Sequence, residues 1–405
     1  MTSSTSTNPI AVLGAGPAGM AAALGLRKAG HEVVVYERYR RARPAGNILN
    51  LWPPPIKALQ DMGVDTVDLG APCHTTFRNA KGRVRADVDL PAHVVDQYGG
   101  GFIGMLRPDL YERMLAAMPA DTIEFDRQAD RIDDHGDGVT ITFSDGVRVE
   151  TPLLIGADGI DSMVRRGLWG ATPKRPHDLH IIGGFTFADS VEAEPNEVVL
   201  SHNRTVQGTY TSIRSRGRSG YQWWVLEAWG DDQAAPADLR AHAAALAAGF
   251  SGPLAQLVAA TPGENLQRWP IRDIEPPAQW SKGRITLAGD AAHATSPYAA
   301  YGAGMSICDG YFLGQLLAGV DLSDSAAVGG ALSEYDRKRI PHTREQVQSA
   351  YMLGRLFHHA PAPLRPIRDF LLDHTPFLQK QVGERNPREI MAQLEEMGGG
   401  ILSRA

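Results

Sequence analysis

A glycine-rich turn near the start of the chain restricts the fold more than any other feature. An apolar run, Ile10–Leu13, leads into Gly14-Ala15-Gly16-Pro17-Ala18-Gly19, and small apolar residues continue to Ala29. A second apolar run, Val33–Tyr36, follows. This order is typical of a strand, a tight turn, a helix and a second strand parallel to the first. We therefore predict that the chain opens with a βαβ unit.

The same turn predicts a dinucleotide site. Glycines let the backbone approach a pyrophosphate closely, and the amides at a helix N-terminus favour its negative charge. Glu37 lies 18 residues after Gly19, at the end of the second strand, where a carboxylate can accept hydrogen bonds from ribose hydroxyls. A plain tight turn is the alternative interpretation.

Two later segments also place an acidic residue at the end of an apolar strand. Residues 153–165 read Leu-Leu-Ile-Gly-Ala-Asp-Gly-Ile-Asp-Ser-Met-Val-Arg, with Asp158 and Gly159 after the strand. Residues 284–293 read Arg-Ile-Thr-Leu-Ala-Gly-Asp-Ala-Ala-His, with Asp290 after the strand. Ligands bind at the carboxyl ends of parallel strands in such folds. For the earlier segment, an ordinary Asp-Gly turn is the alternative.

Alternation of apolar and polar residues predicts further elements. Ile123–Val149 alternates as a β-meander would, and His180–Trp229 alternates as a separate antiparallel sheet. From Gly302 onward the pattern is mostly helical.

The three motifs, in this order, resemble the class A flavoprotein monooxygenases, the family of para-hydroxybenzoate hydroxylase and salicylate hydroxylase, over nearly the whole chain. The resemblance implies an α/β fold, a doubly wound parallel-sheet FAD-binding domain with an inserted antiparallel β-sheet substrate domain and C-terminal helices. The expected division gives 1–73, 98–179 and 280–345 to the FAD-binding domain, 74–97 and 180–279 to the substrate domain, and 346–405 to a C-terminal helical region.

The resemblance also implies the chemistry. FAD would be tightly bound, NADH or NADPH would visit, and reduced flavin would capture O2 as a C4a-hydroperoxide that hydroxylates a small aromatic or heteroaromatic substrate. The chain has a single dinucleotide fingerprint, in keeping with one retained and one visiting nucleotide. The alternatives are a reductase or dehydrogenase of the same fold, and a protein that binds flavin only for structure.

The implied FAD contacts come from the motifs and their surroundings: Gly14, Gly16, Pro17, Ala18, Gly19, Glu37, Arg38, Arg107, Asp158, Gly159, Asp290, Pro297, Gly302, Ala303, Gly304 and Met305. The glycines of the first motif would hold the pyrophosphate, Glu37 the adenosine ribose and Asp290 the ribityl chain. Where the family often has Gly-Gln-Gly-x-Asn, residues 300–304 read Ala-Tyr-Gly-Ala-Gly. Contacts from those amide side chains are therefore lost, whereas backbone amides at a helix start would still stabilise reduced flavin.

Fewer residues are candidates for catalysis and substrate binding. His293 and Tyr298 are candidates for proton handling, although a structural histidine is the alternative for His293. Tyr210, Trp223 and Trp224 could form an apolar slot for a planar ring. The same pattern of aromatic residues on alternating strands is also typical of core packing.

Charge and composition exclude other functions. With 40 basic and 46 acidic side chains the net charge is −6, which argues against a nucleic-acid binder. Two cysteines and 13 histidines show no metal-ligand spacing, so no metal is expected. Glycines interrupt the apolar stretch 10–26, so we expect no membrane span. With only two cysteines, we expect a reducing, cytoplasmic compartment. We also expect a monomer or a homodimer. Arg38, Arg40, Arg41 and Arg43 would attract the phosphates of the nicotinamide cofactor, guard a substrate entrance or form a solvated basic loop.

Overall fold

The structure of the chain is a computed structural model that describes residues 8–41, 48–188, 190–299 and 301–401. Arg43 of the basic cluster and Ala300 lie outside the described residues. Within them, no helix combines the length and the hydrophobicity that a membrane span needs.

A five-stranded parallel sheet carries the three motifs. Its strands are ordered β17-β11-β1-β2-β7 and comprise β1 (Ile10–Leu13), β2 (Val33–Glu37), β7 (Ile123–Phe125), β11 (Leu154–Gly156) and β17 (Ile285–Leu287). Strand β1 pairs with β2 and β11, and β11 pairs with β17, so the strands that precede the motifs are neighbours. Because these strands are parallel, the three motifs leave the sheet at one edge. The predicted βαβ unit is confirmed, with α1 (Pro17–Lys28) between β1 and β2.

A three-stranded antiparallel sheet contains β8 (Ala129–Asp134), β9 (Val139–Phe143) and β10 (Arg148–Thr151). The meander predicted over Ile123–Val149 is therefore only partly correct, because β7 pairs in parallel with β2 instead. Alternation predicts that a segment is extended, but it does not say which strand the segment joins.

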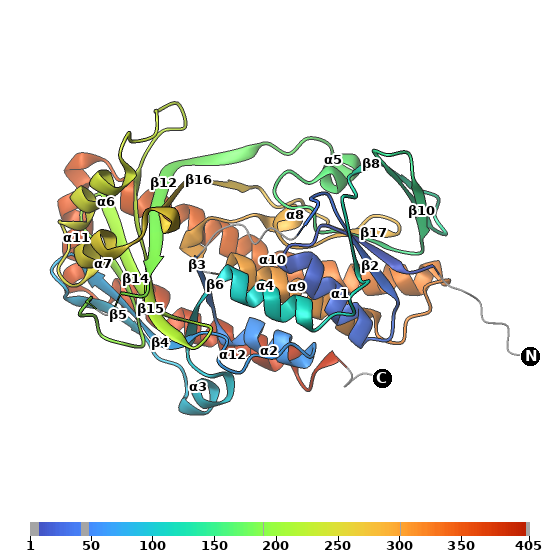
Figure 1. The fold of residues 1–405 in the computed structure, drawn as a ribbon, viewed down its shortest axis with the longest axis horizontal. Helices are drawn as coiled ribbons and strands as arrows, with labels where there is room; N and C mark the ends of the chain where they lie inside the picture. Colours follow the sequence, from blue (N-terminus) through green and yellow to red (C-terminus); the bar gives the residue numbers. More distant parts are fainter. Residues whose placement is uncertain (1–7, 42–47, 189, 300, 402–405) are drawn as a thin grey trace, which may run out of the picture.

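A nine-stranded sheet forms the other half of the molecule, in the order β16-β12-β15-β14-β13-β4-β6-β3 with β5 beside β4. Its strands are β3 (Ile48–Leu51), β4 (Ala71–Asn79), β5 (Val84–Val88), β6 (Phe102–Leu106), β12 (Lys174–Thr186), β13 (Glu197–His202), β14 (Val206–Ser215), β15 (Arg218–Ala228) and β16 (Gln267–Ile274). The antiparallel sheet predicted over His180–Trp229 is confirmed in β12 to β15. Helices α6 (Leu239–Ala247) and α7 (Leu254–Ala260) pack on one of its faces (Figure 1).

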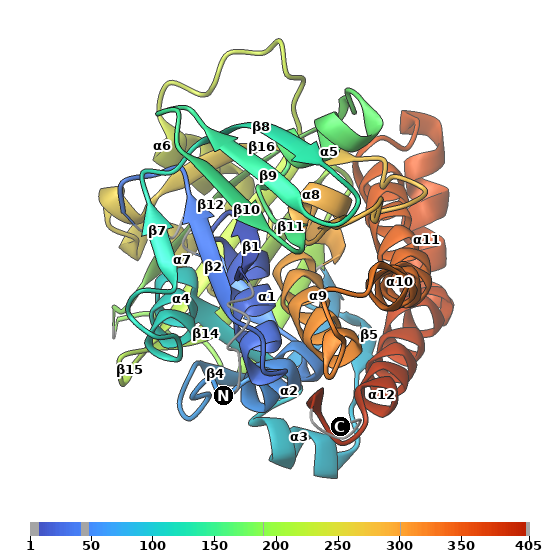
Figure 2. The same ribbon diagram turned by 90° about the vertical axis from the view of Figure 1, so that its right-hand side faces the viewer.

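The long helix α10 (Ser325–His358) connects the two halves. It packs on α8 (Asp290–His293) and α9 (Gly302–Leu317) near the parallel sheet, and on β12 and β14 of the larger sheet. It runs across Figure 1 and is seen end-on in Figure 2, with the C-terminal helices beside it. The remaining helices are α2 (Pro53–Asp61), α3 (Ala92–Tyr98), α4 (Arg107–Ala116), α5 (Met163–Trp169), α11 (Arg365–His374) and α12 (Arg385–Met397).

Helices α1 and α9 are held in backbone contact by glycine. A Cβ atom on Gly310 would lie 2.2 Å from the carbonyl carbon of Ala21, and a Cβ on Gly25 would lie 2.3 Å from the carbonyl oxygen of Gly310. No side chain fits between backbones that approach so closely. This contact fixes the start of α1 relative to the start of α9, and both starts reach the cavity described below.

We predict that Gly310→Ala destabilises the protein by about 1–3 kcal/mol, because the added methyl group must push two helices apart. Equilibrium unfolding in urea measures this. Gly330→Ala is the matched control, because Gly330 is exposed on α10 and nothing lies within 4 Å of its Cβ position. Gly330→Ala should stabilise the protein by up to about 1 kcal/mol, because alanine favours a helix more than glycine does. Equal stability of Gly310→Ala and wild type would contradict the close contact.

Candidate active site

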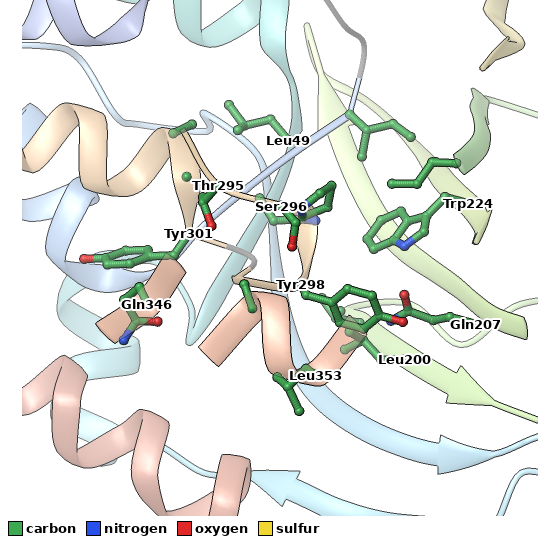
Figure 3. Close-up of a pocket in the computed structure, with 18 of the residues that line it drawn as sticks. Leu49, Leu200, Gln207, Trp224, Thr295, Ser296, Tyr298, Tyr301, Gln346 and Leu353 are labelled. Atoms are coloured by element: carbon green, nitrogen blue, oxygen red, sulfur yellow. The ribbon is translucent and has the colours of Figure 1, made fainter. Parts of the chain in front are cut away.

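A large cavity opens at the edge where the three motifs meet. Its volume is about 1350 Å³, which exceeds the roughly 300–1,000 Å³ of a site for one drug-sized ligand. The motifs line one end, and the C-terminal helices contribute to the other. The nine-stranded sheet and α10 also line that other end, where Leu200, Trp224 and Leu353 lie (Figure 3). The cavity therefore has room for a cofactor and a substrate side by side.

Two helix N-termini face the motif end. Gly16, Pro17 and Ala18 line the cavity at the start of α1, and Gly302 and Ala303 line it at the start of α9. Neither helix start is capped by a hydrogen bond from its N-cap side chain, since Gly16 has none and the Tyr301 hydroxyl donates to Gln393 instead. The first amides of a helix lack partners inside the helix and carry partial positive charge. Both helix starts can therefore bind an anionic or electron-rich group.

Arg107 and Asp290 bring opposite charges to the same end. Each is the first residue of its helix, α4 and α8 respectively, and each lines the cavity with an accessible side chain. Desolvation lowers the pKa of Arg107, and the carboxylate of Asp290 opposes this shift. A guanidinium that is accessible and yet desolvated lies inside a cavity rather than on the outer surface. The pair can bind polar groups of a long ligand.

Buried polar atoms without protein partners mark the same wall. Thr295 Oγ1, Ser296 Oγ and Asp158 Oδ1 have no hydrogen-bond partner among the described residues. Thr295 and Ser296 line the cavity, as does Gly159 beside Asp158. Unsatisfied buried polar atoms cost free energy, so this wall suits a ligand rich in hydroxyl, carbonyl and ring-nitrogen groups. The residues present fit FAD.

Two glycines of the first motif shape the wall from behind. A Cβ on Gly14, whose φ is +102°, would lie 2.4 Å from the carbonyl oxygen of Ala157. A Cβ on Gly19 would lie 1.8 Å from the carbonyl oxygen of Gly14. Gly14 therefore permits contact between the first and second motifs, and Gly19 permits α1 to start directly behind the turn.

Two carboxylates predicted to contact FAD, those of Glu37 and Asp158, accept hydrogen bonds from backbone amides behind the cavity wall. Glu37 accepts hydrogen bonds from the amides of Ala15 (2.8 Å) and Tyr39 (3.0 Å), so it fixes the glycine turn to the end of β2. Asp158 Oδ2 accepts a hydrogen bond from the amide of Met163 (2.7 Å) at the start of α5. The predicted contact of Glu37 with the adenosine ribose and that of Asp158 with FAD stay predictions.

Three further predicted cofactor residues are not brought to the cavity. Arg38 is exposed and donates to the Tyr39 hydroxyl over 3.5 Å. Met305 is buried in the core. A Cβ on Gly304 would lie 2.7 Å from the ring of Tyr301, so this glycine makes room for that ring. Pro297, by contrast, lines the cavity.

His293 belongs to a buried network centred on Asp309. Asp309 Oδ2 pairs with His293 Nε2 (2.6 Å) and accepts from the amide of Gly289 (2.8 Å), and Oδ1 accepts from Arg339 Nε (2.8 Å). Burial raises the pKa of Asp309, but His293 and Arg339 more than offset it, so the pKa lies below its ordinary value. The network ties β17, α8, α9 and α10 together next to Asp290. His293 does not line the cavity, which favours the structural alternative for it.

The two tryptophans of β15 point to opposite faces of the sheet. Trp224 lines the cavity. Trp223 is fully buried under α6 and α7, where its Nε1 donates to Thr261 Oγ1 (2.7 Å). Tyr210 lies opposite Trp223 in the strand pair and packs in the same core. Side chains alternate between faces along a strand, so neighbouring tryptophans cannot both face a substrate.

Tyr298 lines the substrate end together with residues that sequence reasoning did not single out. Leu200 and Gln207 come from the sheet, and α10 contributes Gln346, Ala350, Leu353 and Phe357 (Figure 3). The spacing of the α10 residues is that of one helix face, and this periodicity was a signal available in the sequence. Leu200 and Gln207 carry no comparable signal.

Comparison with known proteins agrees with this geometry. A family model described as an FAD binding domain matches residues 7–350. The chain is 31% identical over 374 residues to 3-amino-4-hydroxybenzoate 2-monooxygenase PtnB3 of Streptomyces platensis, covering 90% of this chain and 92% of that protein. It is 30% identical over 334 residues to 6-hydroxynicotinate 3-monooxygenase of Bordetella bronchiseptica, covering 78% and 85%.

Solved structures share the fold. The complex of Klebsiella pneumoniae HpxO with FAD and uric acid superposes with a TM-score of 0.81 at 24% identity and covers 95% of this chain and 96% of that chain. A salicylate hydroxylase substrate complex superposes with a TM-score of 0.71 at 19% identity, covering 96% and 98%.

We predict that Asp309→Asn destabilises the protein by about 3–5 kcal/mol, because Arg339 loses its buried counter-charge. The wild-type contribution is present above the ordinary carboxylate pKa and is lost as pH falls, since the pKa of Asp309 is lowered in the folded state. Urea unfolding between neutral and acidic pH measures both effects, with the exposed-turn variant Asp137→Asn as control. An Asn variant as stable as wild type at neutral pH would contradict this role.

Proposed function

Because the chain belongs to the FAD binding domain family and is an FAD-dependent monooxygenase that uses NAD(P)H, we propose that its cavity divides into a flavin end and a substrate chamber. The chamber would accept a planar one- or two-ring aromatic or heteroaromatic molecule. The relatives act, by their names, on 3-amino-4-hydroxybenzoate and 6-hydroxynicotinate, which are molecules of this size.

At the flavin end, we assign the starts of α1 and α9 to the two electron-rich parts of FAD. The amides after Gly16 would hold the pyrophosphate, and those after Tyr301 would stabilise negative charge on the reduced ring. Asp290 would accept hydrogen bonds from ribityl hydroxyls, and Arg107 would lie beside it. Bound FAD supplies hydride acceptance and oxygen activation, which no side chain can provide.

In the chamber, Trp224, Leu200 and Leu353 supply apolar surface for a flat ring. Trp224 comes from the sheet and Leu353 from α10, so the ring would lie between two rigid elements. Apolar walls exclude water, which protects reactive oxygen from hydrolysis and holds the ring at a fixed distance.

The observation that carries this proposal is the continuity of the cavity. One space joins Asp290 and two open helix starts to an apolar chamber with a tryptophan wall. A protein that kept flavin only for structure would not need the chamber, and the relatives are named as monooxygenases.

We predict that Asp290→Ala binds FAD on the order of 10–100-fold more weakly, because a charged hydrogen-bond acceptor is lost. Fluorescence titration of the stripped protein with FAD measures this, and Asp137→Ala on an exposed turn is the control. Unchanged FAD affinity would remove Asp290 from the flavin end.

We also predict that an aromatic substrate stimulates NAD(P)H oxidation and that one oxygen atom of its product comes from O2. Mass spectrometry after reaction under ¹⁸O2, with H2¹⁸O as the reciprocal experiment, locates the source. Label from water would refute oxygen insertion from O2. Stimulated oxidation without oxygenated product would favour the reductase alternative.

A further inference from the structure

The start of α9 is tied to two other helices by a buried hydrogen-bonded chain. Tyr301 is the N-cap residue of α9, and its hydroxyl donates to Oε1 of Gln393 on α12 (2.6 Å). Nε2 of Gln393 lies 3.2 Å from Nε2 of His342 on α10. Tyr301 and Gln393 are both buried. The chain therefore joins α9 to α12 and α10 at the place where α9 begins.

The local sequence gives this helix start little stability of its own. Its first turn contains Gly302 and Gly304, and glycine is about 1 kcal/mol less favourable than alanine in a helix. An N-cap side chain often accepts from the first amides of a helix, but that of Tyr301 does not. The Cβ position of Gly304 lies 2.7 Å from the Tyr301 ring, so this glycine makes room for the ring that reaches Gln393. Tertiary contacts must therefore fix where α9 begins.

The groups of this chain are uncharged at neutral pH. Burial raises the pKa of Tyr301 well above its ordinary value. Desolvation lowers the pKa of His342 to about 3, and Arg339 acts in the same sense. In neutral His342, Nε2 can accept the amide hydrogen of Gln393. The chain therefore keeps its donors and acceptors unchanged through the neutral pH range.

Helix α12 is also anchored at its other end. The Tyr311 hydroxyl donates to the carbonyl oxygen of Met397 (2.8 Å), and Nε2 of Gln315 donates to the same oxygen (3.3 Å). Lys338 of α10 pairs with Glu396 (2.6 Å). Because these contacts fix α12 to α9 and α10, Gln393 can hold Tyr301 in a defined position. Helix α12 lies beyond residue 350, where the match to the family model ends.

We propose that the Tyr301–Gln393–His342 chain lets the C-terminal helix α12 set the reduction potential of bound FAD, by holding the start of α9 where its amides stabilise negative charge on the reduced ring. The inference rests on the proposed function, which places that ring at the start of α9. Tyr301, Gln393 and His342 are positioning residues that act through the α9 amides. Without the chain, the glycine-rich turn would move and the oxidised flavin would be favoured.

Spectroelectrochemical titration of the FAD-loaded enzyme measures the midpoint potential. Tyr301→Phe removes the hydroxyl and keeps the ring, whereas Gln393→Met removes both hydrogen bonds and keeps the length of the side chain. Each variant should lose about tenfold of the preference for reduced over oxidised FAD, which lowers the two-electron potential by about 30 mV. The double variant should show no further loss, because both substitutions break the same contact.

Tyr311→Phe is the matched control. It removes a hydroxyl that also links α9 to α12, but ten residues after Tyr301 along α9. Its potential should equal that of wild type. An equal shift in this control would show that the potential responds to any loosening of α12, and would overturn the inference. Unchanged potentials in Tyr301→Phe and Gln393→Met would overturn it as well.

Amide hydrogen exchange tests the helix start without redox chemistry. The Met305 amide donates to the carbonyl oxygen of Tyr301 (2.8 Å), so its exchange rate reports whether the first turn of α9 is fixed. This amide should be protected in wild type, and it should exchange about tenfold faster in Tyr301→Phe and Gln393→Met than in Tyr311→Phe. An unprotected Met305 amide in wild type, or equal protection in all variants, would contradict the inference.

The two proposals fail in different ways. An enzyme that shows the expected potentials and exchange rates but oxygenates no aromatic ring would count against the proposed function alone. An enzyme that oxygenates aromatic rings but has the same potential in wild type, Tyr301→Phe and Gln393→Met would count against the role of α12 alone.

Discussion

The buried carboxylate of Asp309 is the interaction on which the rest of the site depends. It binds the amide of Gly289 directly before Asp290, and it pairs with His293 and Arg339 on two other helices. Gly289 has φ +61°, and its Cβ position lies 2.5 Å from Cβ of Ala18, so this turn also touches the start of α1. One ionised group thus positions the turn that carries Asp290 against both helix starts. Burying such a charge is tolerable only because it is paired and fully hydrogen-bonded.

A second constraint is that the motifs come from distant parts of the chain and must meet at one sheet edge. Parallel pairing of β1, β11 and β17 sets this register, and Arg165 then donates to the carbonyl oxygen of Ala291 (2.6 Å), which ties the second motif to the third. Glycine at positions 25 and 310 draws α1 onto α9. Each contact is short and specific, so displacement of one motif would displace the others.

Sequence reasoning identified the motif strands and α1 because glycine turns and apolar runs are local signals. It also placed Asp290, Gly16 and Tyr298 among the candidates, and the structure brings them to the cavity. It could not tell which of Trp223 and Trp224 faces the cavity, because the sequence does not show which face of the strand other elements cover. It also assigned β7 to the wrong sheet, since pairing is a long-range property. The domain boundaries stay a prediction.

The residues that α10 contributes to the cavity show why the substrate end is the hardest part of the site to predict from sequence. The helix starts at Ser325, whose hydroxyl accepts from Arg284 directly before β17, and it ends at His358, so a single helix spans from the Asp309 network to the chamber. Arg339 and His358 lie 19 residues apart on it, which corresponds to roughly 28 Å of helix at 1.5 Å per residue. A helix of that length connects the Asp309–Arg339 charge pair near the flavin end to the Tyr298–His358 hydrogen bond near the substrate end. Which polar groups of α10 face the chamber therefore depends on where this helix packs in the folded protein, and no local sequence motif encodes that position.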